Sequence, residues 1–283
     1  MTLEEAYSIG KEKLLEAQIQ DAQIDAWILL EFVTDVSRTM YFVNPKQKMT
    51  DKQKEQYLYY IEKRAERIPL QHLTKVQEFM GFPFEVNENV LIPRQDTEVL
   101  VETVLEDLEE HNKILDMCTG SGCILISILK MMQNDKCEDT VWGVGVDVSK
   151  KALEVAERNN RKLQTDAVFI ESDMFENVEG LYHVIVSNPP YIRTSDIEEL
   201  ENEVKLHDPM LALDGKEDGL YFYRIIVNES RKYLKKGGKL YFEIGYDQAQ
   251  DVKKLMEDAG FSNITVKKDL AGLDRVVFGV YNI

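Results

Sequence analysis

Apolar residues recur at three- and four-residue steps through three tracts of the first 75 residues, the spacing of amphipathic helices. These tracts are residues 3–18, 26–42 and 50–67. No glycine lies between Lys11 and Met80. Thr50 or Asp51 can cap the third tract, and Pro69 disfavours its continuation. We expect residues 1–75 to form a small α-helical bundle domain.

Between residues 78 and 93 the pattern changes to aromatic and β-branched residues, which favour extended backbone. Asn87-Glu88-Asn89 supplies a turn signal between two short extended stretches. We therefore predict a β-hairpin linker over residues 76–93, with its turn at these three residues.

From residue 94 to residue 283, strand-like and helix-like segments alternate. Strands are expected at residues 113–118, 141–147, 167–172, 182–188, 239–245, 263–269 and 275–281, and helices at 97–110, 122–132, 149–163, 221–234 and 248–259. Such repeats imply a mainly parallel α/β sheet with helices on both faces. Ligands of these sheets bind outside the carboxyl ends of the strands, so candidate site residues are those that follow each strand.

Composition limits the partners and the location of the chain. Hydrophobic residues make up 44% and charged residues 30% of the sequence, the balance of a soluble globular protein. A net charge of −17 opposes attraction to a phosphate backbone, so we expect no direct nucleic acid binding. No long apolar run predicts a membrane span, and we expect a cytoplasmic protein.

Cys118, Cys123 and Cys137 lack the paired spacing of disulfide or zinc sites, so reduced thiols and no metal are expected.

A loop of small residues follows the first predicted strand of the α/β sheet and precedes a helix. The loop comprises Cys118, Thr119, Gly120, Ser121 and Gly122. Its backbone N–H groups can approach a ligand closely. An ordinary tight turn is the simpler alternative. An NAD site is disfavoured because Leu125 stands where the dinucleotide fingerprint has a third glycine.

Acidic residues follow the next two predicted strands. Asp147 can accept both hydroxyls of a ligand's ribose, although it can equally cap the following helix. Asp173 can accept from an adenine amino group while Met174 packs on the ring. Core packing explains Met174 equally well.

The tetrapeptide Asn188-Pro189-Pro190-Tyr191 follows the fourth predicted strand and carries the sharpest chemical signal. Two prolines cannot continue a central strand, so they form a rigid turn with unpaired carbonyls. With the Asn188 side-chain oxygen, these carbonyls can hold an NH2 group and direct its nitrogen towards a methyl donor. Tyr191 offers a flat face beside that group. A structural Asn-Pro turn is the alternative.

Together with these motifs, several further segments resemble the protein-(glutamine-N5) methyltransferases of the HemK/PrmC type. They are Arg67-Ile68-Pro69-Leu70-Gln71, Glu78-Phe79-Met80-Gly81, Val90-Leu91-Ile92-Pro93-Arg94, Thr97-Glu98, Ala212-Leu213-Asp214-Gly215, Asp218-Gly219-Leu220 and Phe242-Glu243-Ile244-Gly245. The resemblance covers nearly the entire chain.

This resemblance implies a Rossmann-like, seven-stranded class I methyltransferase domain over residues 94–283, behind a helical substrate-recognition domain and a hairpin. It implies S-adenosylmethionine as the methyl donor, bound by residues 118–122, Asp147, Met174 and Asn188. The side-chain chemistry described above adds Asp173 to the cofactor-binding candidates. Asn188 to Tyr191 would hold the glutamine of a Gly-Gly-Gln motif in a peptide-chain release factor. The expected enzyme is a monomer.

The chain departs from the pattern of that family at four places. Cys118 replaces a usual glycine, His72 a usual tyrosine, Thr74-Lys75 an expected glycine, and Gln95-Asp96 a Pro-Glu pair. Cys118 matters most because a side chain there can crowd the cofactor or oppose a positive φ angle. Cysteine is small, so we expect tolerance.

Two alternatives share the tetrapeptide. A DNA or RNA adenine-N6 methyltransferase would have to capture a flipped base and bind the surrounding phosphates, which the acidic composition disfavours. A catalytically silent S-adenosylmethionine-binding interaction module would need no reactive site. The intact tetrapeptide argues against it, whereas Cys118 leaves it open.

Overall fold

A computed structural model describes residues 1–109, 111–134 and 141–282; Cys137 lies outside them. Contacts divide the chain into two units. Unit 1 comprises Met1–Val76 and Glu201–His207, and unit 2 comprises Gln77–Leu200 and Asp208–Ile283. The hairpin after Val76 therefore groups with unit 2, and a short segment from the second half of the sequence groups with unit 1. No helix in the described ranges is both long and apolar enough to cross a membrane.

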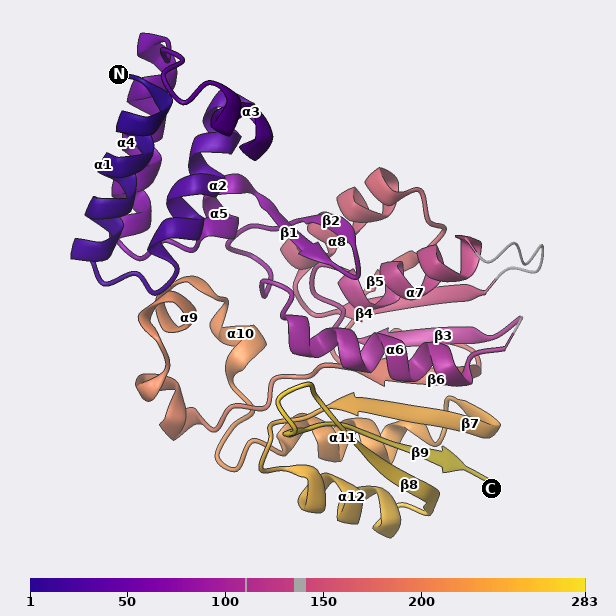
Figure 1. Ribbon diagram of the computed structural model, residues 1–283. Helices are drawn as coiled ribbons and strands as arrows, with labels where there is room; N and C mark the ends of the chain where they lie inside the picture. Colours follow the sequence, from indigo (N-terminus) through magenta and orange to yellow (C-terminus); the bar gives the residue numbers. More distant parts are fainter. Residues whose placement is uncertain (110, 135–140, 283) are drawn as a thin grey trace. The chain divides into compact units, whose positions relative to one another are not determined.

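Unit 1 is a bundle of helices, as the sequence pattern predicts (Figure 1). Its helices are α1 (Leu3–Glu16), α2 (Ala22–Thr34), α3 (Arg38–Val43), α4 (Asp51–Ala65), α5 (Leu70–Thr74) and α9 (Asn202–His207). The prediction of one continuous helix over residues 26–42 is wrong, because two helices cover this tract. Asp35 adopts a left-handed conformation with φ of 56°, which ends α2 and separates it from α3.

The core of unit 1 is formed by the apolar faces of α1, α2 and α4. Tyr57 on α4 is fully buried and donates a hydrogen bond to the Ala26 carbonyl of α2 at 3.2 Å. Gly10 lets α1 approach, because a Cβ there would lie 2.0 Å from the Tyr57 hydroxyl. Thr50 caps α4 in a reciprocal capping box with Gln53, which selects it over Asp51 as the cap.

The hairpin pairs β1 (Val76–Phe79) with β2 (Phe82–Glu85). Its turn is Met80-Gly81, not Asn87-Glu88-Asn89 as predicted. Met80 and Gly81 have φ angles of 52° and 75°, the positive pair that a two-residue turn between right-twisted strands requires. The Glu98 carboxylate accepts a hydrogen bond from the Met80 N–H at 2.6 Å and so stabilises a turn that the methionine alone disfavours.

Unit 2 contains the predicted seven-stranded sheet, in the order β5-β4-β3-β6-β7-β9-β8. The strands are β3 (Lys113–Met117), β4 (Trp142–Asp147), β5 (Val168–Glu171), β6 (Tyr182–Ser187), β7 (Leu234–Glu243), β8 (Phe261–Lys268) and β9 (Asp274–Tyr281). The first five of these in sequence pair in parallel, and β9 is antiparallel to both neighbours.

Helices cover both faces of this sheet (Figure 1). One face packs on α6 (Glu98–Asp107), α7 (Cys123–Asn134) and α8 (Lys150–Leu163), and the other on α11 (Tyr221–Ser230) and α12 (Ala249–Asp258). Successive side chains of β6 alternate between the faces, with Val184 and Val186 on the first and Ile185 on the second. Burial on both faces explains why the central strands read as continuous apolar runs.

A buried ion-pair cluster joins α9 to the other helices of unit 1. The Arg64 guanidinium lies 2.6 Å from the Asp25 carboxylate and 2.9 Å from that of Glu203. The Arg64 and Asp25 side chains are 6% and 7% exposed. Burial raises the pKa of Asp25 because it disfavours the charged carboxylate. The ion pair with Arg64 compensates in part for this desolvation cost.

We predict that Arg64→Met lowers the free energy of unfolding of unit 1 by about 3–5 kcal/mol, because it leaves a buried carboxylate unpaired. Lys13→Met is the matched control: its ion pair with Glu62 is exposed and contributes about 1 kcal/mol or less. Urea denaturation followed by Trp27 fluorescence, in a Trp142→Phe background, measures both. Equal losses in the two variants would contradict the prediction.

Candidate active site

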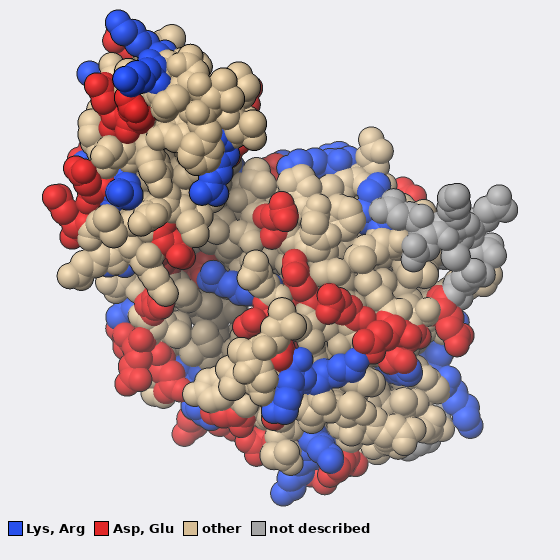
Figure 2. Space-filling model, in the orientation of Figure 1, with Lys and Arg blue, Asp and Glu red and all other residues tan. Residues whose placement is uncertain are grey.

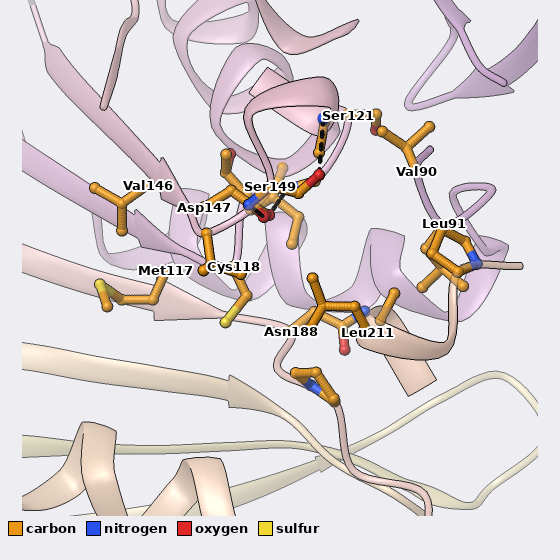
Figure 3. A pocket seen from close by; sticks show the side chains of 18 of the residues that line it. Val90, Leu91, Met117, Cys118, Ser121, Val146, Asp147, Ser149, Asn188 and Leu211 are labelled. Carbon is orange, nitrogen blue, oxygen red and sulfur yellow. Dashed lines mark hydrogen bonds between the residues drawn. The ribbon is translucent and has the colours of Figure 1, made fainter. Parts of the chain in front are cut away.

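A cavity of about 350 Å³ opens at the carboxyl ends of the parallel strands in unit 2 (Figure 3). Residues that follow four strands line it: Cys118 after β3, Asp147 at the end of β4, Asp173 after β5 and Asn188 after β6. The segment before α6, helix α10 (Met210–Leu213) and the start of α11 complete the lining. The volume lies in the range of small-molecule sites.

The loop of small residues between β3 and α7 is held in a tight turn. The Thr119 N–H donates to the Val146 carbonyl at 2.9 Å, and the Thr119 hydroxyl donates to Asp116 at 2.6 Å. Burial raises the pKa of the Asp116 carboxyl to about 7. Gly122 has a φ of 78°, and a Cβ there would lie 2.8 Å from Ile126. The turn therefore needs glycine at this position.

Cys118 adopts a φ of 60°, in the left-handed region that glycine adopts more readily than other residues. Burial raises the pKa of its thiol, which therefore stays protonated. Figure 3 shows the side chain directed towards the same cavity as Asn188. The departure from glycine is thus accommodated in the backbone, with the sulfur placed at the cavity wall.

Asp147 connects the two loops on its side of the cavity. One carboxylate oxygen accepts from the Gly120 N–H at 2.9 Å, and the other accepts from the Ser149 N–H at 2.8 Å. The cap of α8 is Ser149, whose hydroxyl accepts from Ala152. Asp147 is therefore not the helix cap, and each of its oxygens retains a lone pair for a ligand hydroxyl.

Asp173 and Met174 lie together at the rim of the cavity. Asp173 is exposed, whereas Met174 is half-buried and packs against the main core of unit 2. Met174 has a φ of 49°, and its carbonyl accepts from the Ser172 hydroxyl at 2.8 Å. Both roles considered for Met174, core packing and contact with a ligand, are thus compatible with its position.

The tetrapeptide after β6 divides between the cavity and the protein interior. Asn188 and Pro190 line the cavity, whereas Pro189 and Tyr191 are not among its lining residues. The Tyr191 ring packs against the main core of unit 2, and its hydroxyl donates to the Glu243 carboxylate at 3.4 Å. A contact of Tyr191 or Pro189 with a substrate remains a prediction.

The backbone of Tyr191 is enclosed by residues that sequence reasoning named without assigning a function. A Cβ on Gly215 would lie 2.7 Å from the Tyr191 Cα, and one on Gly219 would lie 2.5 Å from the Tyr191 carbonyl oxygen. The Gln248 side chain donates to that same oxygen at 3.0 Å. Close packing against the tetrapeptide therefore requires glycine at positions 215 and 219.

Two polar residues beneath the tetrapeptide were missed as site residues. Thr97 is buried, and its hydroxyl accepts from the Asn188 side-chain NH2 at 3.5 Å. Glu243, at the end of β7, is buried, and burial raises the pKa of its carboxyl to about 7. A threonine before a helix is usually interpreted as a helix cap, and acidic residues are common throughout this sequence. Neither residue therefore indicated a functional site in the sequence.

The remaining wall of the cavity is mainly apolar. Sequence reasoning did not identify Val90, Leu91, Leu211 and Phe222 as lining residues. Arg94 also lines the cavity and makes an ion pair with the buried Asp208 at 2.6 Å. These residues come from segments more than 100 positions apart, and only the folded chain brings them together.

Comparison with known proteins gives matches along almost the whole chain. The PrmC N-terminal domain family matches residues 5–74, and the methyltransferase small domain family matches residues 94–207. The release factor glutamine methyltransferase of Clostridium acetobutylicum is 41% identical over 282 residues, covering 97% of this chain and 95% of that protein. Its counterpart in Caulobacter vibrioides is 40% identical, covering 100% and 97%.

A solved structure, that of a methyltransferase from Pyrococcus furiosus, is similar in fold. It covers 78% of this chain and 100% of its own, with a TM-score of 0.54 and 16% sequence identity. At this identity the similarity establishes the class I methyltransferase fold of unit 2 and nothing about the substrate.

We predict that Cys118→Gly raises the thermal unfolding midpoint of unit 2 by about 1–3 °C. A left-handed conformation costs a residue other than glycine about 1–2 kcal/mol, which exceeds the entropy that glycine adds to the unfolded chain. Cys123→Gly is the matched control and lowers the midpoint, because Cys123 begins a helix. Scanning calorimetry measures both; a lower midpoint for Cys118→Gly would refute the strain at this position.

Proposed function

Because this chain belongs to the family of release factor glutamine methyltransferases, we propose that it methylates a glutamine of peptide-chain release factors. The methyl group passes from S-adenosylmethionine to the side-chain amide nitrogen, N5, of the glutamine in a Gly-Gly-Gln motif. One observation carries the proposal: Asn188 follows β6 at the same cavity as Asp147 and the loop over residues 118–122.

The cavity suits S-adenosylmethionine in both shape and chemistry. A Cβ on Gly120 would meet no atom within 4 Å, so the loop surface there is open to a ligand. Asp147 keeps a lone pair on each oxygen for the ribose hydroxyls, and Met174 offers an apolar surface for adenine. When bound, the cofactor supplies an electrophilic methyl group on a sulfonium.

The chain's own contribution to catalysis is the positioning of the amide. An amide nitrogen is a weak nucleophile because its lone pair is delocalised into the carbonyl. The Asn188 side-chain oxygen and a carbonyl of the proline turn accept the two amide hydrogens, which concentrates electron density on the nitrogen and fixes its direction of attack. No histidine is among the residues that line the cavity in the described part of the chain, so no dedicated general base is proposed.

Unit 1 is the proposed contact surface for the release factor, and the enzyme is proposed to act as a monomer in the cytoplasm. A protein substrate agrees with the surface charge. On the face shown in Figure 2, lysine and arginine are interspersed with aspartate and glutamate rather than gathered into one basic patch. A net charge of −17 likewise disfavours nucleic acid as the substrate.

We predict that Asn188→Ala lowers kcat at least 100-fold, the loss expected when a positioned polar group at the reacting centre is removed. The dissociation constant for S-adenosylmethionine should stay within about threefold, because the loop and Asp147 remain. Transfer of a labelled methyl group to purified release factor measures kcat, and isothermal titration measures cofactor binding.

Asn228→Ala, on the exposed side of α11, is the matched control and should keep wild-type turnover. Turnover of the Asn188→Ala protein within tenfold of wild type would contradict the role of Asn188. Cofactor binding by the wild type without any transfer would instead indicate the silent binding module.

A further inference from the structure

We propose that Asn159 is a positioning residue for cofactor binding, whose side-chain amide joins the loop over residues 118–122 to the start of another segment of the cavity wall. The inference rests on the proposed function, because it concerns the S-adenosylmethionine site. Asn159 lies on α8, is fully buried and is not among the residues that line the cavity. It therefore acts through its neighbours and not by contact with the ligand.

The oxygen and both N–H groups of the Asn159 side-chain amide are hydrogen-bonded. The oxygen accepts from the Glu85 N–H at 2.6 Å, and the NH2 group donates to the Glu85 carbonyl and the Ser121 carbonyl, each at 3.0 Å. The exchange of two hydrogen bonds with Glu85 matches the pairing of residues on neighbouring antiparallel strands. One amide thus joins the end of β2 to the loop between β3 and α7.

The orientation of this amide is fixed by its three partners. A reversed amide would place its oxygen against two carbonyl oxygens and its NH2 group against an N–H donor. Aspartate has nearly the same shape as asparagine, but its ionised carboxylate only accepts hydrogen bonds and would face the same two carbonyl oxygens. The position therefore requires an amide, and a carboxylate would release the loop.

The face of α8 that carries Asn159 packs directly on the loop. A Cβ on Gly122 would lie 3.2 Å from the Cβ of Ala156, which lies three residues before Asn159 on the same face of the helix. The loop backbone is held by side chains at two successive residues, Gly120 through Asp147 and Ser121 through Asn159. Of these two side chains, Asp147 lines the cavity and Asn159 does not.

The segment that follows Glu85 forms another part of the cavity wall. Val90 and Leu91 of this segment line the cavity (Figure 3). Val86 and Val90 pack on α8 in a small buried cluster, and Arg158 of α8 makes an ion pair with the Glu85 carboxylate at 2.6 Å. Helix α8 thus supports both the loop and this segment, and Asn159 is hydrogen-bonded to both.

Loss of the Asn159 amide weakens cofactor binding because it frees the loop. When a ligand binds only one loop conformation, its dissociation constant increases in inverse proportion to the fraction of molecules in that conformation. A fraction of about one fifth raises the dissociation constant about fivefold. The tetrapeptide after β6 has no hydrogen bond to Asn159, so we expect the methyl-transfer step itself to change little.

The experiment compares Asn159→Ala with Asn160→Ala, a matched control at the next residue of α8. The Asn160 side chain also makes three hydrogen bonds, but its partners are Thr165 and Ala167, which lie before β5 and outside the loop. Isothermal titration with S-adenosylmethionine, below the unfolding temperature of each protein, measures binding. We expect the dissociation constant to rise at least fivefold for Asn159→Ala and to stay within about twofold of wild type for Asn160→Ala.

Two further measurements distinguish positioning from a general loss of stability. Without cofactor, the amides of Gly120 and Gly122 should exchange hydrogen faster in Asn159→Ala than in wild type or Asn160→Ala. In methyl transfer to release factor, the KM for S-adenosylmethionine should rise with the dissociation constant, while kcat at saturation stays within about threefold of wild type. Asn159→Asp, which fills the same volume, should weaken binding at least fivefold as well.

Failure of this inference and failure of the proposed function give different results. A rise of less than fivefold in either folded Asn159 variant, or an equal rise in Asn160→Ala, would overturn the inference, and either Asn159 variant decides alone if the other fails to fold. No binding of S-adenosylmethionine by the wild type would overturn both. Cofactor binding without transfer to release factor would overturn the proposed function alone, because the titrations still decide the role of Asn159.

Discussion

The parallel register of four neighbouring strands is the constraint on which the site depends. Met117 on β3 pairs with Val146 on β4 and with Ser187 on β6, so these strands end at the same level. The residues that follow therefore emerge side by side at one edge of the sheet. The Ser187 hydroxyl, which donates to the Met117 carbonyl at 2.7 Å, reinforces the β3–β6 pairing immediately before Asn188. A shift of register would separate the loop over residues 118–122 from the tetrapeptide.

Two buried carboxyl groups support the loops at this edge. Asp116 receives the Thr119 hydroxyl under the loop after β3, and Glu243 receives the Tyr191 hydroxyl under the loop after β6. Burial raises the pKa of each to about 7. A buried carboxyl without a hydrogen-bond donor destabilises the fold. Breaking the hydrogen bond from either hydroxyl is therefore unfavourable. These hydrogen bonds restrain both loops, and the proposed positioning of an amide requires such restraint.

The sheet and its ligand-binding edge could be predicted because they depend on local patterns. Apolar runs mark β3 to β7, and a strand cannot continue through Pro189 and Pro190. The hairpin turn was misplaced for an equally local reason. Asn87 and Asn89 are common turn residues, whereas the positive φ of Met80 depends on Glu98, a residue 18 positions away.

Interactions between distant residues explain what sequence reasoning missed in unit 1 and at the site. Glu203 joins α9 to unit 1 through Arg64, a pairing across 139 positions that no periodicity reveals. Thr97 precedes a helix and would be interpreted as a helix cap, whereas in the structure its hydroxyl accepts from the Asn188 side chain, 91 positions away. Gly215 and Gly219 were recognised only as parts of the family resemblance, and their packing against Tyr191 is what requires glycine.

The most direct test of the central claim is tandem mass spectrometry of a purified release factor after incubation with the protein and isotopically labelled S-adenosylmethionine. Glutamine-N5 methylation predicts one labelled methyl group, located on the side chain of the Gly-Gly-Gln glutamine. A methyl group on any other residue, or an unmodified release factor in the presence of protein that binds the cofactor, would contradict it.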